Sequence, residues 1–168
     1  MVRIIGITLA YFITGLLSLQ LAIPPGYAAP VWPAAGIGLA VILLYGNRIW
    51  PGVFLGSFFV NVFTSFDPSS VHTILGSLFV PICIGGGAVF QALFGAFLIR
   101  RFAGFPTSLN NLSNVFRIMA LGGPVGCLVN SSVGVTSLVL AGTLPLDNVI
   151  QNWWNWYLGD FIGVIIVI

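Results

Sequence analysis

Two Trp-Pro pairs, Trp32-Pro33 and Trp50-Pro51, each stand at the start of a Gly-rich apolar run. Proline suits the first turn of a helix, because the N–H group that it lacks would have no partner there. Tryptophan favours the membrane–water boundary, where its ring is buried and its N–H stays hydrated. The only polar break between the two runs is Gly46-Asn47-Arg48. This stretch therefore predicts two tightly connected membrane helices, each beginning at a Trp-Pro pair.

The composition of the whole chain supports the same class of protein. Of its 168 residues, 58% are hydrophobic and 5% are charged, and there is no Lys and no Glu. Soluble domains carry roughly 25% charged residues, so a water-soluble fold is excluded. Long unbroken apolar runs favour helices over barrel strands, in which apolar and polar residues alternate. The sequence predicts an all-α integral membrane protein, a polytopic bundle, with residues 1–168 forming a single membrane domain.

Prolines and polar breaks divide the chain into six apolar segments. We expect about six transmembrane helices, over the ranges Val2–Ile23, Trp32–Tyr45, Ile49–Phe66, Val71–Ile99, Val115–Ala141 and Val149–Ile168. A separate interfacial helix is expected before the fifth segment, because Leu109, Leu112, Val115 and Phe116 share one helical face. The chain stops within an apolar run, and we expect it to be a fragment, or the ordered part, of a longer polypeptide.

The charged residues predict the orientation of the bundle. With six spans and a cytoplasmic N-terminus, Asp67, His72 and Asp147 fall on the outer side. All the arginines then fall on the inner side: Arg3, Arg48, Arg100, Arg101 and Arg117. Positively charged residues in short loops favour the cytoplasm. Both termini are therefore expected to be cytoplasmic.

Asp160 is the residue that points most directly to a function. It lies in an apolar segment, just deeper than a run of aromatic residues that includes Trp154. A carboxylate at this depth costs at least a few kcal/mol unless it faces polar groups or water. Two interpretations stay open: a pocket that meets a ligand, a proton or a polar partner, and a structural tie to a nearby Asn, Ser or Arg. Asn61 lies at a similar depth and is a candidate partner. The expected ligand-binding or signal-sensing residues are Asp160, Asn61, Trp32, Trp154 and His72.

The other polar and small residues favour packing over chemistry. Asn130-Ser131-Ser132 and Gln91 are interpreted as interhelical hydrogen-bonding groups, and Gly52 and Gly56 as a GxxxG packing surface. The sequence contains no HExxH motif, no paired acidic residues and no phosphate-binding loop. His72 has no second ligand near it in the sequence, and the five arginines are scattered. We expect no enzymatic activity in this segment, no metal site, no cofactor and no nucleic-acid partner.

Three motifs resemble signatures of the MASE1 family, the membrane-associated sensor domains of bacterial signalling proteins. They are Val31-Trp32-Pro33-Ala34-Ala35-Gly36, the run from Gly46 to Asn61, and the run from Trp154 to Gly163. Ala34 replaces the second proline of the family's first motif. The positions that match are Pro33, Gly36, Arg48, Trp50, Pro51, Gly52, Gly56, Gly159 and Gly163.

The resemblance implies a sensory input domain in the bacterial inner membrane. It would be joined to a cytoplasmic signalling module, such as a diguanylate cyclase or the histidine kinase of a two-component system. Two alternatives stay open from the residues alone. One is the substrate-binding membrane subunit of a small-molecule uptake transporter. The other is a scaffold whose Gly-rich faces bind a partner membrane protein or a second copy of this chain in the lipid bilayer.

Overall fold

The computed structural model describes residues 1–22, 28–65, 68–69, 71–104 and 112–168, with the side chains of α4 described from Ser77 onward. Every regular element in these ranges is helical. The main helices are α1 (Val2–Leu19), α2 (Pro33–Tyr45), α3 (Trp50–Ser65), α4 (Val71–Leu98), α5 (Leu112–Ala120), α6 (Gly126–Leu140) and α7 (Val149–Val167). Short 3-10 turns precede α3 and α7, at Asn47–Ile49 and Leu146–Asn148, and π-helical turns follow α4 and α5, at Ile99–Ala103 and Leu121–Val125.

Each predicted segment contains a helix, but the predicted interfacial helix is not a separate element. Instead, α5 runs into α6 through the π-helical turn, and together they form one apolar stretch over Leu112–Leu140. The turn contains Gly122, Gly123 and Pro124, and a widened turn accommodates a proline that cannot donate a backbone hydrogen bond. Leu109, which was assigned to the interfacial face, lies outside the described residues.

Three helical stretches of the described chain are long and apolar enough to cross a membrane. They are Val2–Leu19, Ser77–Ala103 and Leu112–Leu140, and the helix Pro33–Tyr45 is apolar but shorter. The first helix is shorter than predicted, because α1 ends at Leu19. The α3 helix begins at Trp50, one residue later than predicted, and the predicted end at Phe66 lies outside the described residues. The all-helical membrane fold is thus confirmed, whereas the count of six spans stays a prediction.

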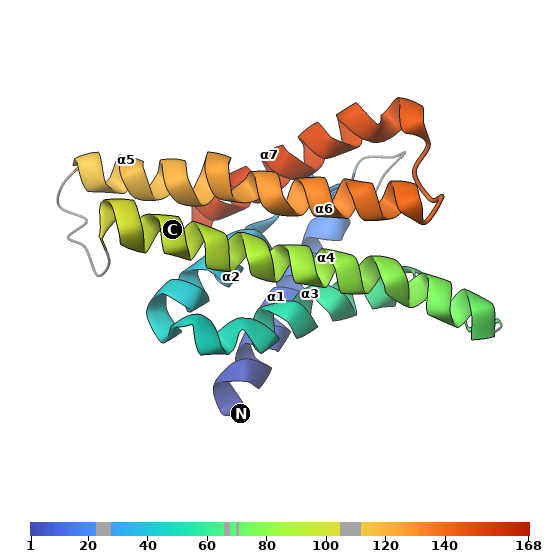
Figure 1. The fold of residues 1–168 in the computed structure, drawn as a ribbon. Coiled ribbons are helices and arrows are strands. Elements are labelled where there is room, and N and C mark those ends of the chain that lie inside the picture. The colour runs from blue at the N-terminus through green and yellow to red at the C-terminus, as the bar shows by residue number, and fades with distance from the viewer. Residues whose placement is uncertain (23–27, 66–67, 70, 105–111) are drawn as a thin grey trace.

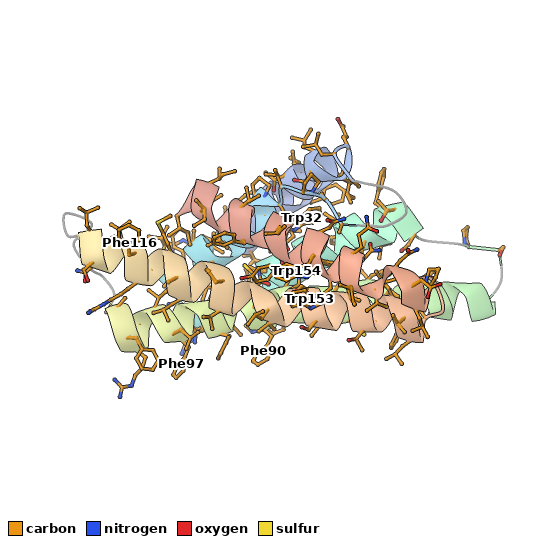
Figure 2. The ribbon with its side chains drawn as sticks, turned by 90° about the horizontal axis from the view of Figure 1, so that it is seen from above. Trp32, Phe90, Phe97, Phe116, Trp153 and Trp154 are labelled. Atoms are coloured by element: carbon orange, nitrogen blue, oxygen red, sulfur yellow. The ribbon has the colours of Figure 1, made fainter. Side chains whose placement is uncertain are left out.

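The helices form a bundle around a core that mixes alanines with larger aliphatic side chains and Tyr11. The α4 and α6 helices lie side by side, α3 packs between α4 and α1, and α7 packs against α2 and α6 (Figure 1). Large exposed apolar side chains, such as Phe90, Phe97 and Phe116, point away from the bundle (Figure 2). A helix that is apolar both inside and outside is typical of a membrane environment, where the outer face meets lipid.

The arginines gather toward one end of the bundle. The α2–α3 turn, the end of α4 and the start of α5 lie at this end, and the α6–α7 turn lies at the other (Figure 1). Arg100 of the π turn after α4 donates to the Asn47 Oδ1 atom at 2.6 Å and to the Ile42 carbonyl oxygen at 2.5 Å. The Arg3 guanidinium lies 5.1 Å from the ring centre of Tyr45. The exposed Asp147 lies in the α6–α7 turn, at the opposite end.

Candidate functional site

The first and third sequence motifs meet at a backbone-to-backbone junction between α7 and the start of α2. The Trp32 N–H donates to the Gly159 carbonyl oxygen at 3.0 Å. A Cβ atom at Gly159 would collide with the Ala29 carbonyl oxygen, and one at Gly163 would collide with the carbonyl oxygen of Trp32. A Cβ atom at Gly36 would in turn collide with the Gly163 carbonyl oxygen. These glycines let two chain segments approach to a distance that no side chain allows.

The second motif holds α1 against α3. A Cβ atom at Gly56 would lie 2.5 Å from the Cβ atom of Tyr11, and one at Gly52 would lie 3.0 Å from that of Ile7. The Thr8 hydroxyl donates to the Gly52 carbonyl oxygen at 3.3 Å, which strengthens the same contact. The tight packing buries Tyr11, which is 1% exposed, in the middle of the bundle. The Gly52–Gly56 spacing therefore acts as the sequence predicts, and it also positions a phenol.

Asp160 follows Gly159 on α7 and is completely buried, with 0% exposure. Its Oδ2 atom accepts a hydrogen bond from Asn130 Nδ2 of α6 at 3.3 Å. The Asn130 backbone N–H donates to Gln91 Oε1 of α4 at 3.3 Å, so three helices contribute to one polar cluster. A Cβ atom at Gly87 would lie 2.6 Å from Asn130 Oδ1, so this glycine makes room for the amide.

Two oxygen atoms of this cluster have no donor. Neither Asp160 Oδ1 nor Asn130 Oδ1 accepts a hydrogen bond from any described residue. Most buried polar atoms in proteins are hydrogen-bonded, and an unpaired buried charge costs several kcal/mol. A structural tie between Asp160 and Asn130 therefore accounts for only part of this arrangement.

A cavity of about 20 Å³ lies beside this pair. Its described lining includes five side chains that carry oxygen atoms: Tyr11, Ser57, Asn61, Asn130 and Asp160. Two indole rings, those of Trp32 and Trp156, also line it. Such a volume has room for about one water molecule or an ion of similar size. The cavity therefore offers an oxygen-rich surface to a small occupant and no room for an organic molecule.

The predicted site residues separate into three groups. Asp160, Asn61 and Trp32, which come from α7, α3 and the start of α2, line the same cavity. Trp154 is 50% exposed and lies along α7 beside Trp153 (Figure 2), outside the described cavity lining. The side chain of His72 lies outside the described residues.

The expected pairing of Asp160 with Asn61 is replaced by the hydrogen bond from Asn130. Asn61 instead donates from Nδ2 to the Ser57 carbonyl oxygen of its own helix at 2.8 Å. The depth argument placed Asn61 and Asp160 at one level, and they do line one cavity. The depth of a residue in the membrane does not reveal which helices are neighbours. Because α7 packs against α6 and α2, the hydrogen-bond partner of Asp160 comes from α6.

Tyr11, Ser57 and Trp156 are cavity residues that sequence reasoning did not select. Tyr11 stands within an otherwise apolar helix, and a buried tyrosine hydroxyl usually has a polar partner. Its hydroxyl interacts with the side chains of Trp32 and Ser57. Ser57 directly follows Gly56 of the packing motif, so its place next to the α1–α3 contact was a usable signal.

Arg48 of the second motif is exposed, and its neighbour Asn47 makes the described interhelical contact. Because Arg100 donates to both Asn47 and Ile42, it connects the end of α4 to the α2–α3 turn. The Gly46-Asn47-Arg48 turn thus provides a hydrogen-bond acceptor for Arg100 through the Asn47 side chain.

Comparison with known proteins agrees with the motif resemblance. The family model MASE1 matches residues 1–168, which is the whole chain. "Probable diguanylate cyclase DgcE" of Escherichia coli (strain K12) is 25% identical over 171 residues, which cover 100% of this chain and 14% of that relative. No solved structure matches the chain. Since the family match covers the complete sequence, this chain belongs to the MASE1 family of membrane sensor domains.

Proposed function

We propose that this chain is a membrane-embedded input domain that passes a signal to a cytoplasmic output module. The family match and the relative support a sensory role in signalling proteins. Because the chain spans 14% of the relative named as a diguanylate cyclase, the rest of such a protein has ample length for an output module. A diguanylate cyclase is the type of output that this relative favours, and a histidine kinase is the other type implied by the resemblance.

One observation carries the proposal: all three family motifs build the surroundings of Asp160. The first and third motifs form the glycine junction that sets α7 against the start of α2. The second motif packs α1 on α3 and so places Tyr11 and Ser57 in the cavity lining. Packing alone does not require a buried carboxylate at the point where the motifs meet. We therefore propose Asp160, Asn61 and Trp32 as sensing residues.

The α7 helix is our candidate for transmitting the signal. It carries Asp160 and is the last helix of the described chain. Occupancy of the cavity would favour one of two arrangements of α7 relative to α1, α3 and α6, and a ligand shifts such a balance only if it binds the two states differently. With six spans in a bacterial inner membrane and both termini in the cytoplasm, the signal would pass through this helix, or through helices that follow it, to the output module.

A chimera tests the sensory role. The segment of the E. coli relative that matches this chain is replaced by residues 1–168, and cyclic diguanylate is measured in cells that express the chimera. Asp160→Asn is expected to change the output at unchanged protein abundance. Asp147→Asn, the same chemical change in the exposed α6–α7 turn, is the matched control and is expected to leave it unchanged. Equal output from wild type and Asp160→Asn at equal abundance would contradict the assignment.

The transporter alternative receives no specific support from the site. An uptake subunit must hold an organic substrate, and the described cavity of about 20 Å³ is far smaller than the several hundred Å³ typical of sites for such molecules. Co-purification of the native protein with a transport ATPase would favour that alternative, and we expect none.

A further inference from the structure

The cavity beside Asp160 combines three properties that point to one class of occupant. It is about the size of a water molecule, its described polar lining is rich in oxygen atoms, and two of these oxygens lack a donor. Both of them, Asp160 Oδ1 and Asn130 Oδ1, belong to residues that are at most 2% exposed. Such acceptors are stabilised by a cation or by a proton donor, and hardly at all by an apolar ligand.

The charge around the cavity is also unbalanced. The titratable side chains that interact electrostatically with Asp160 are Tyr11 of α1 and Cys127 of α6. Neither of these groups can carry a positive charge. The Tyr157 phenol lies nearby on α7 itself, and the described polar groups facing the site from α2, α3 and α4 are uncharged: Trp32, Ser57, Asn61 and Gln91. No arginine is among the groups that act on Asp160. Four of the five arginines lie in the α2–α3 turn, at the end of α4 and in α5, which are toward one end of the bundle in Figure 1.

We propose that this cavity binds one monovalent cation, with Asp160 as its charged ligand and neutral oxygen atoms completing the coordination. A single carboxylate matches a single positive charge, whereas sites for divalent cations usually contain several carboxylates or retained waters. Na⁺ is a hard cation that oxygen atoms hold, whereas a proton would bind to the Asp160 carboxylate itself and leave a water molecule in the cavity. The inference rests on the proposed function, in which occupancy of this cavity is the signal.

Fluorescence provides a direct test, because Trp32 and Trp156 line the cavity. The purified full chain in lipid nanodiscs is titrated with NaCl against choline chloride at constant ionic strength, and separately with acid. Tryptophan emission and the melting temperature are recorded in both series. A saturable change with NaCl identifies Na⁺ as the occupant, whereas a change with acid that NaCl does not affect means that Asp160 is neutralised by protonation, and it overturns the cation site. A wild type that responds to neither titration overturns the proposal and leaves an ordered water as the occupant.

Variants assign the response to the cavity. Asp160→Asn keeps the shape of the side chain and removes its charge, so the response is expected to disappear. Asp147→Asn, at the exposed α6–α7 turn, is expected to respond as the wild type does. A response that persists in Asp160→Asn overturns the site. If that variant does not fold, Tyr11→Phe replaces it: loss of one lining oxygen is expected to weaken the apparent affinity about tenfold, and an unchanged affinity overturns the placement of the cation here.

This test is separate from the test of signalling. Ion binding is measured on the purified chain, and cyclic diguanylate is measured on the chimera in cells. A chain that binds the ion but does not alter the output of the chimera would contradict the sensory role and leave the cation site standing. A chimera that depends on Asp160 but whose input domain shows no ion response would contradict the cation site alone.

Discussion

Several glycines in this protein matter because they lack a side chain, which lets neighbouring backbone segments come into direct contact. Gly159 and Gly163 let the α7 helix touch the backbone on either side of Trp32, and the neighbouring Asp160 is thereby held at the cavity. The colliding atoms would be backbone carbonyl oxygens, which cannot move aside as a flexible side chain would. Gly159 and Gly163 therefore fix the position of the Asp160 carboxylate.

Gly163→Ala tests this role of the glycines. The added methyl group would overlap the Trp32 carbonyl oxygen, so we expect a destabilisation of ~3 kcal/mol or more and little folded protein. Gly86→Ala is the matched control, because a Cβ atom at this helical glycine of α4 meets nothing within 4 Å, and its stability is expected to stay within about 1 kcal/mol of wild type. Size-exclusion chromatography of detergent extracts reports the folded fraction. A monodisperse Gly163→Ala protein at wild-type yield would contradict the collision.

The sequence alone identified the carboxylate and two of the residues that line its cavity, but not the residues that neighbouring helices bring to it. Asp160 was found because a carboxylate inside an apolar segment is costly, and Asn61 and Trp32 also line its cavity. Tyr11, Ser57 and the hydrogen-bond partner Asn130 depend on which helices are adjacent. Hydropathy and residue spacing carry no information about this adjacency, since any apolar face can pack on any other in a membrane.

Elements of secondary structure are connected here by polar contacts at their ends. The α2 helix ends before Gly46, whose φ of +85° favours glycine, and the chain then turns directly into α3. Arg100 donates to Ile42 near the end of α2 and to Asn47 in the turn. The Ile42 carbonyl oxygen also accepts a hydrogen bond from the Gly46 N–H at 3.0 Å, so the arginine adds a second, charge-assisted donor to this oxygen near the helix end. This contact joins α4 to the α2–α3 hairpin.

Arg100→Ala is therefore expected to destabilise the protein. Hydrogen bonds to charged groups contribute about 1.5–3 kcal/mol, and the exposure of the contact to Asn47 places the expected loss near the lower value. We expect the melting temperature to fall by about 2–4 °C per kcal/mol, as measured by thermal unfolding in detergent. Arg48→Ala removes the same charge from an exposed position of the same turn, and its melting temperature should match wild type. Equal losses in the two variants would mean that charge at this end matters and the contact does not.

The predicted helix ranges were close to the observed ones, since prolines and polar breaks are local signals. The fourth and sixth segments were predicted as Val71–Ile99 and Val149–Ile168, and α4 and α7 cover Val71–Leu98 and Val149–Val167. The error lay in the fifth segment, where we expected an interfacial helix separate from the span. The α5 helix begins at Leu112 and runs into α6 through the π-helical turn that contains Pro124. The structure continues the rod there through a π-helical turn, because packing on neighbouring helices compensates for the lost hydrogen bond. This compensation depends on tertiary packing, so the local sequence around Pro124 does not reveal it.

The molecule as a whole has a distinct basic end. Arg3 lies over Tyr45 and Arg100 donates to Asn47, so both contact the α2–α3 turn region that also contains Arg48. Asp147 lies in the α6–α7 turn, at the opposite end of the bundle. Charge patterning along the chain predicted this separation before any packing was known. The same charge rule predicts that the basic end faces the cytoplasm.

Reporter fusions test this orientation. A fluorescent protein fused after Ile168 should mature and emit, whereas alkaline phosphatase at the same point should be inactive, because it folds only outside the cytoplasm. Insertion of each reporter next to Asp147, in the α6–α7 turn, should give the opposite result. Phosphatase activity at both points would show that α7 does not cross the membrane, and it would reduce the number of spans below six.

The hydrogen bond from Trp32 to Gly159 has a consequence for how this domain can vary between species. It ties the sequence of α7 to the path of the chain before α2, so a change in either segment must preserve this contact beside the cavity. We therefore expect that an insertion near residues 28–32 is tolerated only together with a compensating change at positions 159 or 163, and the reverse. The outward-facing phenylalanines are expected to tolerate substitution by other apolar residues. Sequence variation among such domains would then be concentrated at the outward-facing positions, whereas the contact between Trp32 and Gly159 would be retained.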